Sequence, residues 1–404
     1  MRTLAYVDPK KATNRDFDSE SMAGKIKLLH VITGLTTGGA ERALYNLLKG
    51  GLSERLNSRI ISLKDDGTIG PRIRELGVPV TTLEMLGGWP SLSGLTKLRR
   101  IVTEFQPDLI QGWMYHGNVA AILARTMLSR RPILVWTIHS SLYDLSHEGP
   151  ITRQVIRANR FFSSTPDALL YVGWLARKRH EEFGFAPQNG RIIPNGIDVQ
   201  QFSFSSVSRQ RVRSELGIPQ DAPVIGHVAR LHPMKDHQSF LHAATDLSLR
   251  YPETHFLLCG RDVLPEESSL AQRIPVHVQD RFHLLGERSD VADLMSAMDI
   301  FCQSSWSEAF PIALGEAMVT QVPCVATDVG DSATIIGDTG VVVPPRNVAA
   351  LAGGIERLLT MPVEGRRTMG ASARARIEAN YSLEAVVEEH ALLYEELMRH
   401  KRAG

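Results

Sequence analysis

Hydrophobic and polar positions along the chain follow two alternating patterns. Short apolar runs rich in β-branched residues, such as KIKLLHVI (25–32), PILVWTIHS (132–140) and IFCQSS (300–305), are typical of buried strands. Between such runs, apolar residues recur every three or four positions, as in ERALYNLLKGGL (41–52) and DHQSFLHAATDLSLRY (236–251), which is typical of amphipathic helices. Strands that alternate with helices in this way predict an α/β fold built on parallel sheets.

The alternation breaks once, at NGIDVQQFSFSS (195–206), and then starts afresh, which predicts two domains. Two α/β domains enclose a cleft, and ligands bind in such clefts where strands end and helices begin. The pattern divides the chain into a loose tail at residues 1–24, an N-terminal α/β domain at 25–200, a C-terminal α/β domain at 201–382 and a final helix at 383–404.

Composition and charge narrow the class of protein. Of 404 residues, 43% are hydrophobic and 22% are charged, which is typical of a globular protein, and no apolar run approaches the roughly 20 residues of a membrane span. Residues 25–198 hold 22 basic and 14 acidic residues, a net charge of +8, whereas residues 199–404 carry a net charge of −7. This asymmetry predicts that the N-terminal half faces an anionic ligand or surface.

The three cysteines, Cys259, Cys302 and Cys324, each lie in an apolar strand-like run. We interpret them as buried free thiols in a reducing compartment rather than as a disulfide framework or a metal site. Because the N-terminal segment also has no apolar stretch long enough for a signal peptide, we expect a cytoplasmic protein.

The segment VARLHPMKDH places Arg230 at the end of a predicted strand and Lys235 near the start of the next helix. Two cations beside a helix N-terminus form an anion site suited to phosphate. The alternative is that both are ordinary surface residues.

The segment SEAFPIALGEAM (307–318) holds Glu308 and Glu316 on either side of Pro311. Proline suits the first turn of a helix, and the backbone N–H groups from Phe310 to Ala313 can then face an anion or hydroxyl groups. Each carboxylate can accept hydrogen bonds from vicinal hydroxyls, as on ribose or a hexose. The alternative is a helix with an acidic N-terminus and a solvated Glu316.

In the N-terminal half, Gly38 and Gly39 follow the first predicted strand and allow a phosphate or sugar to approach the backbone closely. His116 and His139 each follow a strand, and each is more often a structural hydrogen bonder than a site residue. Histidines 227, 232, 237 and 242 recur every five residues, which would scatter their rings around a helix. We therefore predict no metal site and no metal cofactor.

The chain resembles the retaining glycosyltransferases of family 4, which have the GT-B fold. The resemblance covers roughly residues 25 to 390. It rests on TTGGAERAL, TIHS, IPNGID, VARLHPMKD, LLGERSDVADLMSAMDIFCQSSWSEAFPIALGEAM and PCVATDVG, which occur in the order typical of that family. It implies two Rossmann-like domains that face each other across a cleft, an acceptor site in the N-terminal domain, a nucleotide-sugar site in the C-terminal domain, and a last helix that crosses back to the N-terminal domain.

The resemblance also implies roles for individual residues. Arg230 and Lys235 would hold the donor diphosphate, and Glu316 would bind the ribose. Glu308 would contact the donor sugar, and backbone N–H groups in the stretch from Phe310 through Pro311 and Ile312 to Ala313 would contact sugar and phosphate. His139 would lie near the reacting carbon. Gly38 and Gly39 would lie by the phosphate and the acceptor entrance, and the base would stack near Leu285 and Gly286. Catalytic roles are thus expected for Glu308, His139, Arg230 and Lys235, with no metal.

One departure from the family pattern follows TDVG, where the family often continues with Gly and then Glu. This chain has Asp331 and no Glu, in the run DSATIIGDTG, so the donor contacts of this loop are in question.

The expected reaction is transfer of a hexose-type sugar, with UDP-linked donors most frequent in the family, to a glycan or lipid-linked acceptor of cell-surface polysaccharide or glycolipid synthesis. ITRQVIRANRFF (151–162) places Arg153, Arg157 and Arg160 on one helical face beside two phenylalanines, which fits either a solvated face or peripheral attachment to the anionic inner face of a membrane.

Two other functions share this architecture: a sugar-nucleotide epimerase or hydrolase, which needs no acceptor, and a non-catalytic nucleotide-sugar-binding protein. Dependence of turnover on an acceptor would distinguish them from a transferase. Because the basic residues are not interleaved with aromatic ones, we expect no nucleic-acid partner.

Overall fold

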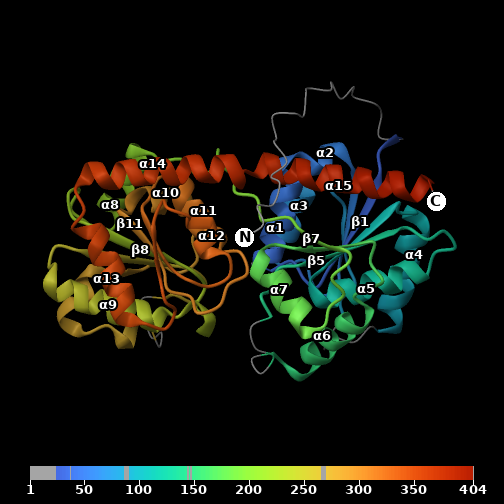
Figure 1. Cartoon of the computed structure of the whole chain (residues 1–404), viewed down its shortest axis with the longest axis horizontal. Helices are drawn as coiled ribbons and strands as arrows, with labels where there is room; N and C mark the ends of the chain where they lie inside the picture. Colours follow the sequence, from blue (N-terminus) through green and yellow to red (C-terminus); the bar gives the residue numbers. More distant parts are fainter. Residues whose placement is uncertain are drawn as a thin grey trace.

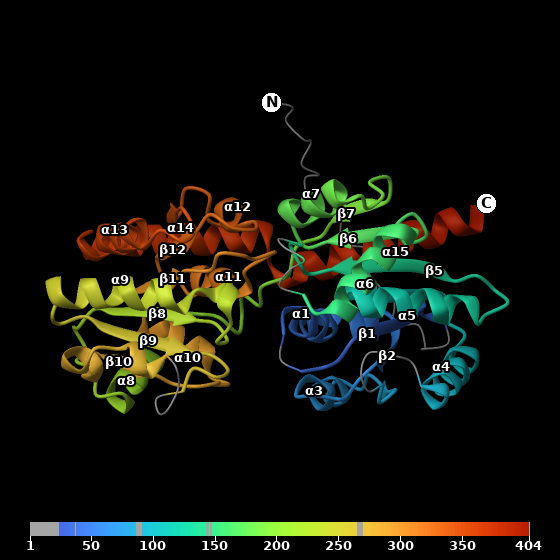
Figure 2. The same ribbon diagram turned by 90° about the horizontal axis from the view of Figure 1, so that it is seen from below.

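The computed structural model describes residues 24–36, 38–85, 91–142, 145, 148–264 and 270–403. The tail predicted at residues 1–24 therefore lies, except for Gly24, outside the described residues. The described chain forms two parallel sheets that lie side by side, each with helices on both faces (Figures 1 and 2). The predicted α/β architecture is confirmed.

The N-terminal sheet has seven strands in the order β3-β2-β1-β4-β5-β6-β7, and all neighbouring strands are parallel. Its strands are β1 (Lys27–Ile32), β2 (Asn57–Ser62), β3 (Val80–Thr82), β4 (Leu109–Trp113), β5 (Ile133–Ile138), β6 (Ala168–Tyr171) and β7 (Gly190–Ile192). The connecting helices are α1 (Gly39–Leu47), the π-helical turn η3 (Leu48–Leu52), α2 (Ser53–Arg55), α3 (Ile69–Glu75), α4 (Leu92–Phe105), α5 (Met114–Thr126), α6 (Pro150–Phe162) and α7 (Trp174–Phe183).

The C-terminal sheet has six strands in the order β10-β9-β8-β11-β12-β13, again all parallel. Its strands are β8 (Val224–Val228), β9 (His255–Cys259), β10 (Phe282–Leu284), β11 (Ile300–Gln303), β12 (Cys324–Thr327) and β13 (Val341–Val343). The helices are α8 (Ser206–Glu215), η6 (Pro233–Lys235), α9 (His237–Arg250), η7 (Ala271–Arg273), η8 (Val276–Arg281), α10 (Val291–Ala297), α11 (Ile312–Val319), α12 (Ser332–Ile336), α13 (Val348–Leu359), α14 (Val363–Asn380) and α15 (Leu383–Ala403).

The central strands are mostly apolar because both faces of each sheet are covered. In β1, Leu29 and Val31 pack into the core shared with α4 and α5, whereas Leu28 and Ile32 pack into the opposite core with α1 and α3. Successive side chains of a strand point to opposite faces, so a strand between two helical layers places apolar residues on both of its faces.

The last helix, α15, crosses from the C-terminal domain back to the N-terminal one, as Figure 1 shows in red along the upper edge. The crossing begins at Ser382, which forms a parallel β-bridge with Ile197. Farther along, Tyr394 is fully buried, and its hydroxyl donates a hydrogen bond of 2.7 Å to Oε1 of Gln111 in β4. The crossing that the family resemblance implied is therefore present.

The order of strands reverses in each sheet at its centre, between β1 and β4 and between β8 and β11. Ligands of such sheets bind beside the carboxyl ends of the strands at this reversal. The loop after β1 carries Gly38, and the loops after β8 and β11 carry Arg230 and Glu308. The fold thus brings the segments selected from the sequence to these central strand ends.

The sequence pattern missed several polar helices, of which α14 is the clearest. Of its 18 residues only Gly370, Ala373 and Ile377 are buried. Such a narrow apolar stripe, made largely of small residues, gives almost no periodic signal, although the helix packs closely on α11.

Candidate active site

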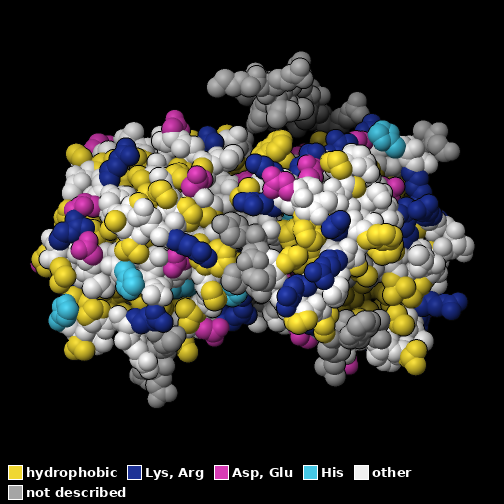
Figure 3. Space-filling model, turned by 60° about the horizontal axis from the view of Figure 1, so that its bottom comes forward, with side chains coloured by type: hydrophobic (Ala, Val, Ile, Leu, Met, Phe, Trp, Pro, Cys, Tyr) yellow, Lys and Arg dark blue, Asp and Glu magenta, His cyan; other side chains and the backbone are white. Residues whose placement is uncertain are grey.

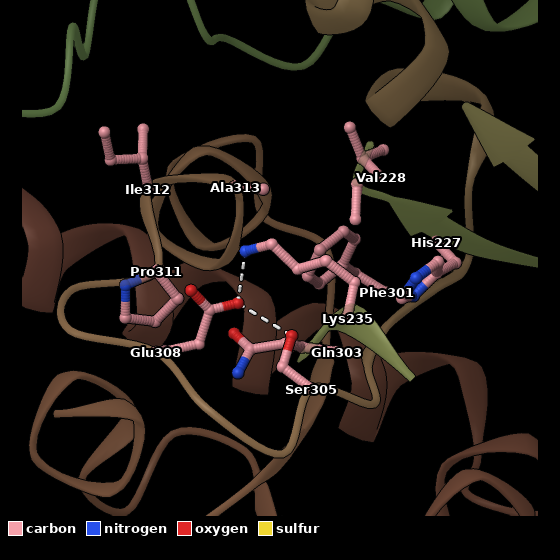
Figure 4. A pocket seen from close by; sticks show the side chains of 11 residues that line it. His227, Val228, Lys235, Phe301, Gln303, Ser305, Glu308, Pro311, Ile312 and Ala313 are labelled. Atoms are coloured by element: carbon pink, nitrogen blue, oxygen red, sulfur yellow. Dashed lines mark hydrogen bonds and ion pairs between the residues drawn. The ribbon is translucent and has the colours of Figure 1, made fainter. Parts of the chain in front are cut away.

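A small cavity of about 40 Å³ lies at the carboxyl ends of β8 and β11 (Figure 4). Within it, Nζ of Lys235 lies 2.5 Å from Oε1 of Glu308, and the hydroxyl of Ser305 donates a 2.7 Å hydrogen bond to the same oxygen. The lining residues are His227, Val228, Ala229, Lys235, Phe301, Gln303, Ser305, Glu308, Pro311, Ile312 and Ala313.

The loops after β8 and β11 hold each other in place. The indole of Trp306 donates a 2.8 Å hydrogen bond to the carbonyl of Pro233, and the hydroxyl of Ser304 donates one of 2.9 Å to the carbonyl of Lys235. Asp236 then caps α9 with φ of 48°, accepting a hydrogen bond from the backbone N–H of Ser239. These contacts fix the backbone that carries Lys235 opposite the Glu308 loop.

Helix α11 begins at Ile312, after the proline that the sequence predicted in its first turn. Pro311 is the N-cap, with an extended ψ of 94°, so it lies before the first turn rather than in it. Ile312 and Ala313 form the first turn and line the cavity, and the N–H groups of a first turn have no acceptor within their own helix. Phe310 packs its ring against Tyr381, with 5.6 Å between the ring centroids.

Glu316 is buried at the interface between the two domains. Its side chain is 3% exposed, and Oε1 forms an ion pair with the guanidinium of Arg42 on α1 of the other domain. Oε2 is also buried and has no hydrogen-bond partner among the described residues. Burial raises the pKa of Glu316, and Arg42 opposes that rise. The alternative of a solvated helix residue is therefore wrong.

Arg230 lies in a cluster of charges that the sequence revealed only in part. Burial and the neighbouring Arg261 lower the pKa of Arg230, whereas Glu308 and Glu41 act in the opposite direction. Arg261 comes shortly after β9, as Arg230 does after the adjacent β8, and this shared position is the signal that could have identified it. Glu41 comes from α1, and burial raises the pKa of its carboxyl group.

Gly38 is the N-cap of α1, in an extended conformation, and Gly39 is the first residue of that helix. A Cβ atom on Gly38 would lie 2.3 Å from Oε2 of Glu41, whereas one on Gly39 would meet no atom within 4 Å. Gly38 therefore lets the Glu41 carboxylate lie against the backbone, and Gly39 leaves open space beside the first turn of α1, where Glu41 and Arg42 face the C-terminal domain.

His139 follows β5 and stacks on Trp113, with 5.3 Å between the ring centroids. Both ring nitrogens are buried and lack hydrogen-bond partners among the described residues. Burial, followed by the influence of His390, lowers the pKa of His139 to about 3, so its imidazole is neutral near pH 7. The His139 loop approaches the Glu308 loop through the hydroxyls of Ser141 and Ser307, which lie 3.1 Å apart.

The remaining candidates lie farther from the cavity. Leu285 directly follows β10, and its N–H donates a hydrogen bond to the carbonyl of Leu258, so it shares the strand-end edge without lining the cavity. His116 lies in α5, where burial, followed by Lys64, lowers its pKa. The structure thus gathers Lys235, Glu308, Pro311, Ile312 and Ala313 at the cavity.

Asp331 does not take part in the cavity. Its carboxylate accepts hydrogen bonds from the N–H groups of Trp174 (2.9 Å) and Leu175 (3.1 Å) at the start of α7. The loop that departs from the family pattern therefore caps a helix of the N-terminal domain.

The expectation that the histidine series scatters is wrong for two of its members. His227 and His237 meet edge to face, with 4.7 Å between their ring centroids, because His227 lies on β8 rather than on a helix. Burial lowers the pKa of His227 to about 4 and that of His237 to about 3. Within the described residues, no group of three or more His, Cys, Asp or Glu side chains is placed to hold a metal ion.

The prediction for the cysteines is confirmed in its structural part, since Cys259, Cys302 and Cys324 are buried and form no disulfide. None of the helices in the described part of the chain has the length and apolar character that a membrane crossing requires.

In comparison with known proteins, both halves of the chain match models of glycosyltransferase families. The model for Glycosyltransferase Family 4 matches residues 37–201, and the model for Glycosyl transferases group 1 matches residues 222–361. The crystal structure of Anabaena HepE in complex with UDP-glucose superposes with a TM-score of 0.77, at 22% identity, covering 92% of this chain and 100% of that one.

Two curated relatives extend over most of both chains. The N-acetyl-alpha-D-glucosaminyl L-malate synthase of Bacillus anthracis is 25% identical over 289 residues, which is 71% of this chain and 74% of the relative. The UDP-Gal:alpha-D-GlcNAc-diphosphoundecaprenol alpha-1,3-galactosyltransferase of Escherichia coli is 22% identical over 327 residues, 78% of this chain and 83% of the relative. With two facing Rossmann-like domains and a returning C-terminal helix, the protein has the GT-B fold, and it belongs to the family 4, group 1 glycosyltransferases.

Proposed function

We propose that this glycosyltransferase moves a hexose-type sugar from a nucleotide diphosphate sugar to a glycan or lipid-linked acceptor, with retention of the anomeric configuration. The observation that carries the proposal is that a cationic site and a buried carboxylate lie at the same cleft. Arg230 and Lys235 offer cations for a diphosphate, and Glu316 offers a buried carboxylate oxygen without a described partner. A nucleoside diphosphate sugar carries both complementary groups, namely phosphates and vicinal hydroxyls.

In this proposal the donor displaces a contact between two side chains of the protein itself. Lys235 is paired with Glu308 at 2.5 Å, and a diphosphate would compete for the ammonium group. Glu308 would then be released toward the donor sugar, beside the first-turn N–H groups of Ile312 and Ala313. His139, Gly38 and Gly39 would face the donor from the N-terminal domain, and Leu285 would contact the base.

In the proposed chemical step, the acceptor hydroxyl attacks the anomeric carbon of the donor sugar from the same face from which the diphosphate leaves. The bond between the anomeric carbon and the diphosphate oxygen breaks, the acceptor oxygen bonds to the same face of that carbon, and the acceptor proton passes to the departing phosphate oxygen. Arg230 and Lys235 would stabilise the negative charge that develops on the diphosphate, and we expect them to do so without an added metal ion. Turnover that persists in excess EDTA would support this expectation.

The named activities of relatives make UDP the first donor to test. Anabaena HepE was crystallised with UDP-glucose, and the Escherichia coli relative is named for UDP-Gal, but a Corynebacterium glutamicum relative with 29% identity over 251 residues is named as a GDP-mannose-dependent mannosyltransferase. The nucleotide is therefore an outcome of the experiment.

A screen of UDP-, GDP- and ADP-sugars, with and without a bacterial lipid extract, tests the proposed function. Release of one nucleotide that requires both a particular sugar donor and the extract would support transfer to a lipid-linked acceptor. Release without the extract, at the same rate, would contradict the proposed acceptor class. NMR of the product tests retention, because an inverted anomeric configuration would overturn the proposed step.

Helices α6 and α7 carry the surface that we propose for contact with an anionic membrane face. Phe161 is 79% exposed and Trp174 is 53% exposed, and Arg157 and Arg160 are exposed beside them. On the right half of Figure 3, basic and apolar side chains lie next to each other. Aromatic side chains beside arginines suit the boundary between anionic headgroups and acyl chains.

Sedimentation with liposomes tests this surface. We expect the protein to sediment with phosphatidylglycerol vesicles at low salt and to be released by high salt, because each arginine contributes about 1 kcal/mol of attraction that salt screens. Replacing Arg157 and Phe161 together by Ser should reduce binding, whereas replacing the exposed Arg357 on α13 should not. Equal sedimentation with neutral and anionic vesicles would contradict the proposal.

A further inference from the structure

Helix α1 reaches across the cleft and contacts the buried carboxylate on α11. Nη2 of Arg42 pairs with Oε1 of Glu316, although the two residues are 274 positions apart in the chain. The Arg42 side chain is 36% exposed and that of Glu316 is 3% exposed. The pair therefore joins a partly solvated cation of one domain to a buried anion of the other.

Burial would neutralise Glu316 in the absence of a cation, since an ionised carboxylate is costly in a low-dielectric interior. The elements around α11 supply no second cation for it among the described residues. Arg374, from α14, donates to the carbonyl of Val319 at the far end of α11 and pairs with Glu378.

The other titratable groups near α11 are also accounted for. Lys235 is paired with Glu308. On the strands beneath the helix, burial raises the pKa of the Cys302 and Cys324 thiols, so both are neutral. Among the described residues, Arg42 is thus the cation that acts on the Glu316 carboxylate.

We propose that Arg42 is a positioning residue for the donor: from the N-terminal domain it keeps Glu316 ionised and holds Oε1, which leaves Oε2 to accept hydrogen bonds from the nucleotide ribose. This inference rests on the proposed role of Glu316 in donor binding. It adds that the nucleotide site of the C-terminal domain is complete only when α1 of the other domain is docked against it.

Isothermal titration of the full chain with UDP, GDP and ADP tests the inference, using the nucleotide that binds the parent protein most tightly. We expect Arg42→Ala to raise its Kd about tenfold near pH 7, because loss of the cation favours the protonated form of Glu316. The deficit should shrink as the pH rises from about 6 to about 8.5, since alkali restores the carboxylate. Arg42→Lys should recover part of the affinity over the same range, because it retains the charge.

Two further variants separate this role from a structural one. Arg55→Ala removes an exposed cation from α2, where it pairs with Glu388, and should leave the Kd unchanged. In a Glu316→Gln background, Arg42→Ala should have little further effect, because the group on which it acts is gone. Arg42→Gln, which keeps a hydrogen-bond donor without the charge, serves if the alanine variant does not fold.

The outcomes distinguish this inference from the proposed function. If Glu316→Gln weakens binding but Arg42→Ala does not, at any pH, the positioning role is overturned and the donor site stands. If Arg42→Ala tightens binding, Arg42 blocks the ribose position instead, and the inference is likewise overturned. If no nucleotide binds the parent protein, or Glu316→Gln has no effect, the assignment of the donor site fails and the inference fails with it.

Discussion

Arg230 and Arg261 follow neighbouring strands, and Arg261 is close enough to disfavour the charge of Arg230. Burial and this repulsion both lower the pKa of Arg230. An anionic ligand offsets this repulsion between two cations, which favours its binding between them. The proposed diphosphate site is therefore arranged to respond to the charge of the leaving group.

At this scale we predict that Arg230→Ala lowers kcat more than it raises KM for the donor. Loss of one preorganised donor to a developing charge typically costs about 10²- to 10³-fold in kcat. Steady-state kinetics with the donor identified in the screen would measure the changes in kcat and KM separately. The variant Arg357→Ala, at an exposed position, serves as the control. A rise in KM with unchanged kcat would mean that Arg230 binds the ground state only.

Helix α7 depends on the other domain for its N-terminal cap. Its N-cap residue is Gly173, which has no side chain, and the carboxylate of Asp331 supplies the acceptor instead. A carboxylate at a helix N-terminus satisfies free N–H groups and interacts favourably with the helix dipole. The loop that departs from the family sequence pattern thus has a structural function across the cleft.

We predict that Asp331→Ala lowers the free energy of unfolding by about 1 to 2 kcal/mol, because the N–H groups of Trp174 and Leu175 lose their acceptor. Asp331→Asn should cost less, since the amide oxygen can still accept one of the two hydrogen bonds. Urea denaturation would measure both, with Asp328→Ala as the control, because Asp328 is exposed in the same loop. An Asp331→Ala variant as stable as the control would refute the capping role.

For the whole molecule, the interior beneath α15 is unusual in holding several neutral histidines. Burial lowers the pKa of His30 and of His139 to about 3, with a further contribution from His390, and burial lowers that of His390 to about 4. Each is depressed below the roughly 6.5 of an unfolded chain, so the unfolded state binds more protons in acid. Their contribution to stability is present above about pH 6.5 and is lost as the pH falls toward the folded-state values.

We predict that the melting temperature of the parent protein falls between pH 7 and pH 5, and that His390→Gln falls less over the same interval. For His390 alone, the shift from about 6.5 to about 4 corresponds to about 2 kcal/mol at pH 5. Calorimetry at matched ionic strength would compare the two proteins. Parallel pH dependence of both would mean that His390 is not buried in its neutral form.

The two-domain α/β class, most of the strands and the segments at the strand ends followed from the sequence, whereas polar helices such as α14 did not. Local pattern decides them, since a strand such as β5 that is covered on both faces is apolar at most positions. Arg230, Lys235 and Glu308 could be chosen as candidate site residues in the same way, because each follows an apolar run that ends at the ligand-binding edge of a sheet.

What only the tertiary structure decided are the contacts between the domains. The pair of Arg42 with Glu316 and the cap of Asp331 on α7 join residues 274 and 157 positions apart, and no local pattern encodes such a meeting. The burial that raises the pKa of Glu316 and lowers that of His139 has the same origin, because it comes from the packing of one domain and of α15 against another. Residue type and spacing determine which groups reach the cleft, and the packing of the two domains determines which of them carry charge there.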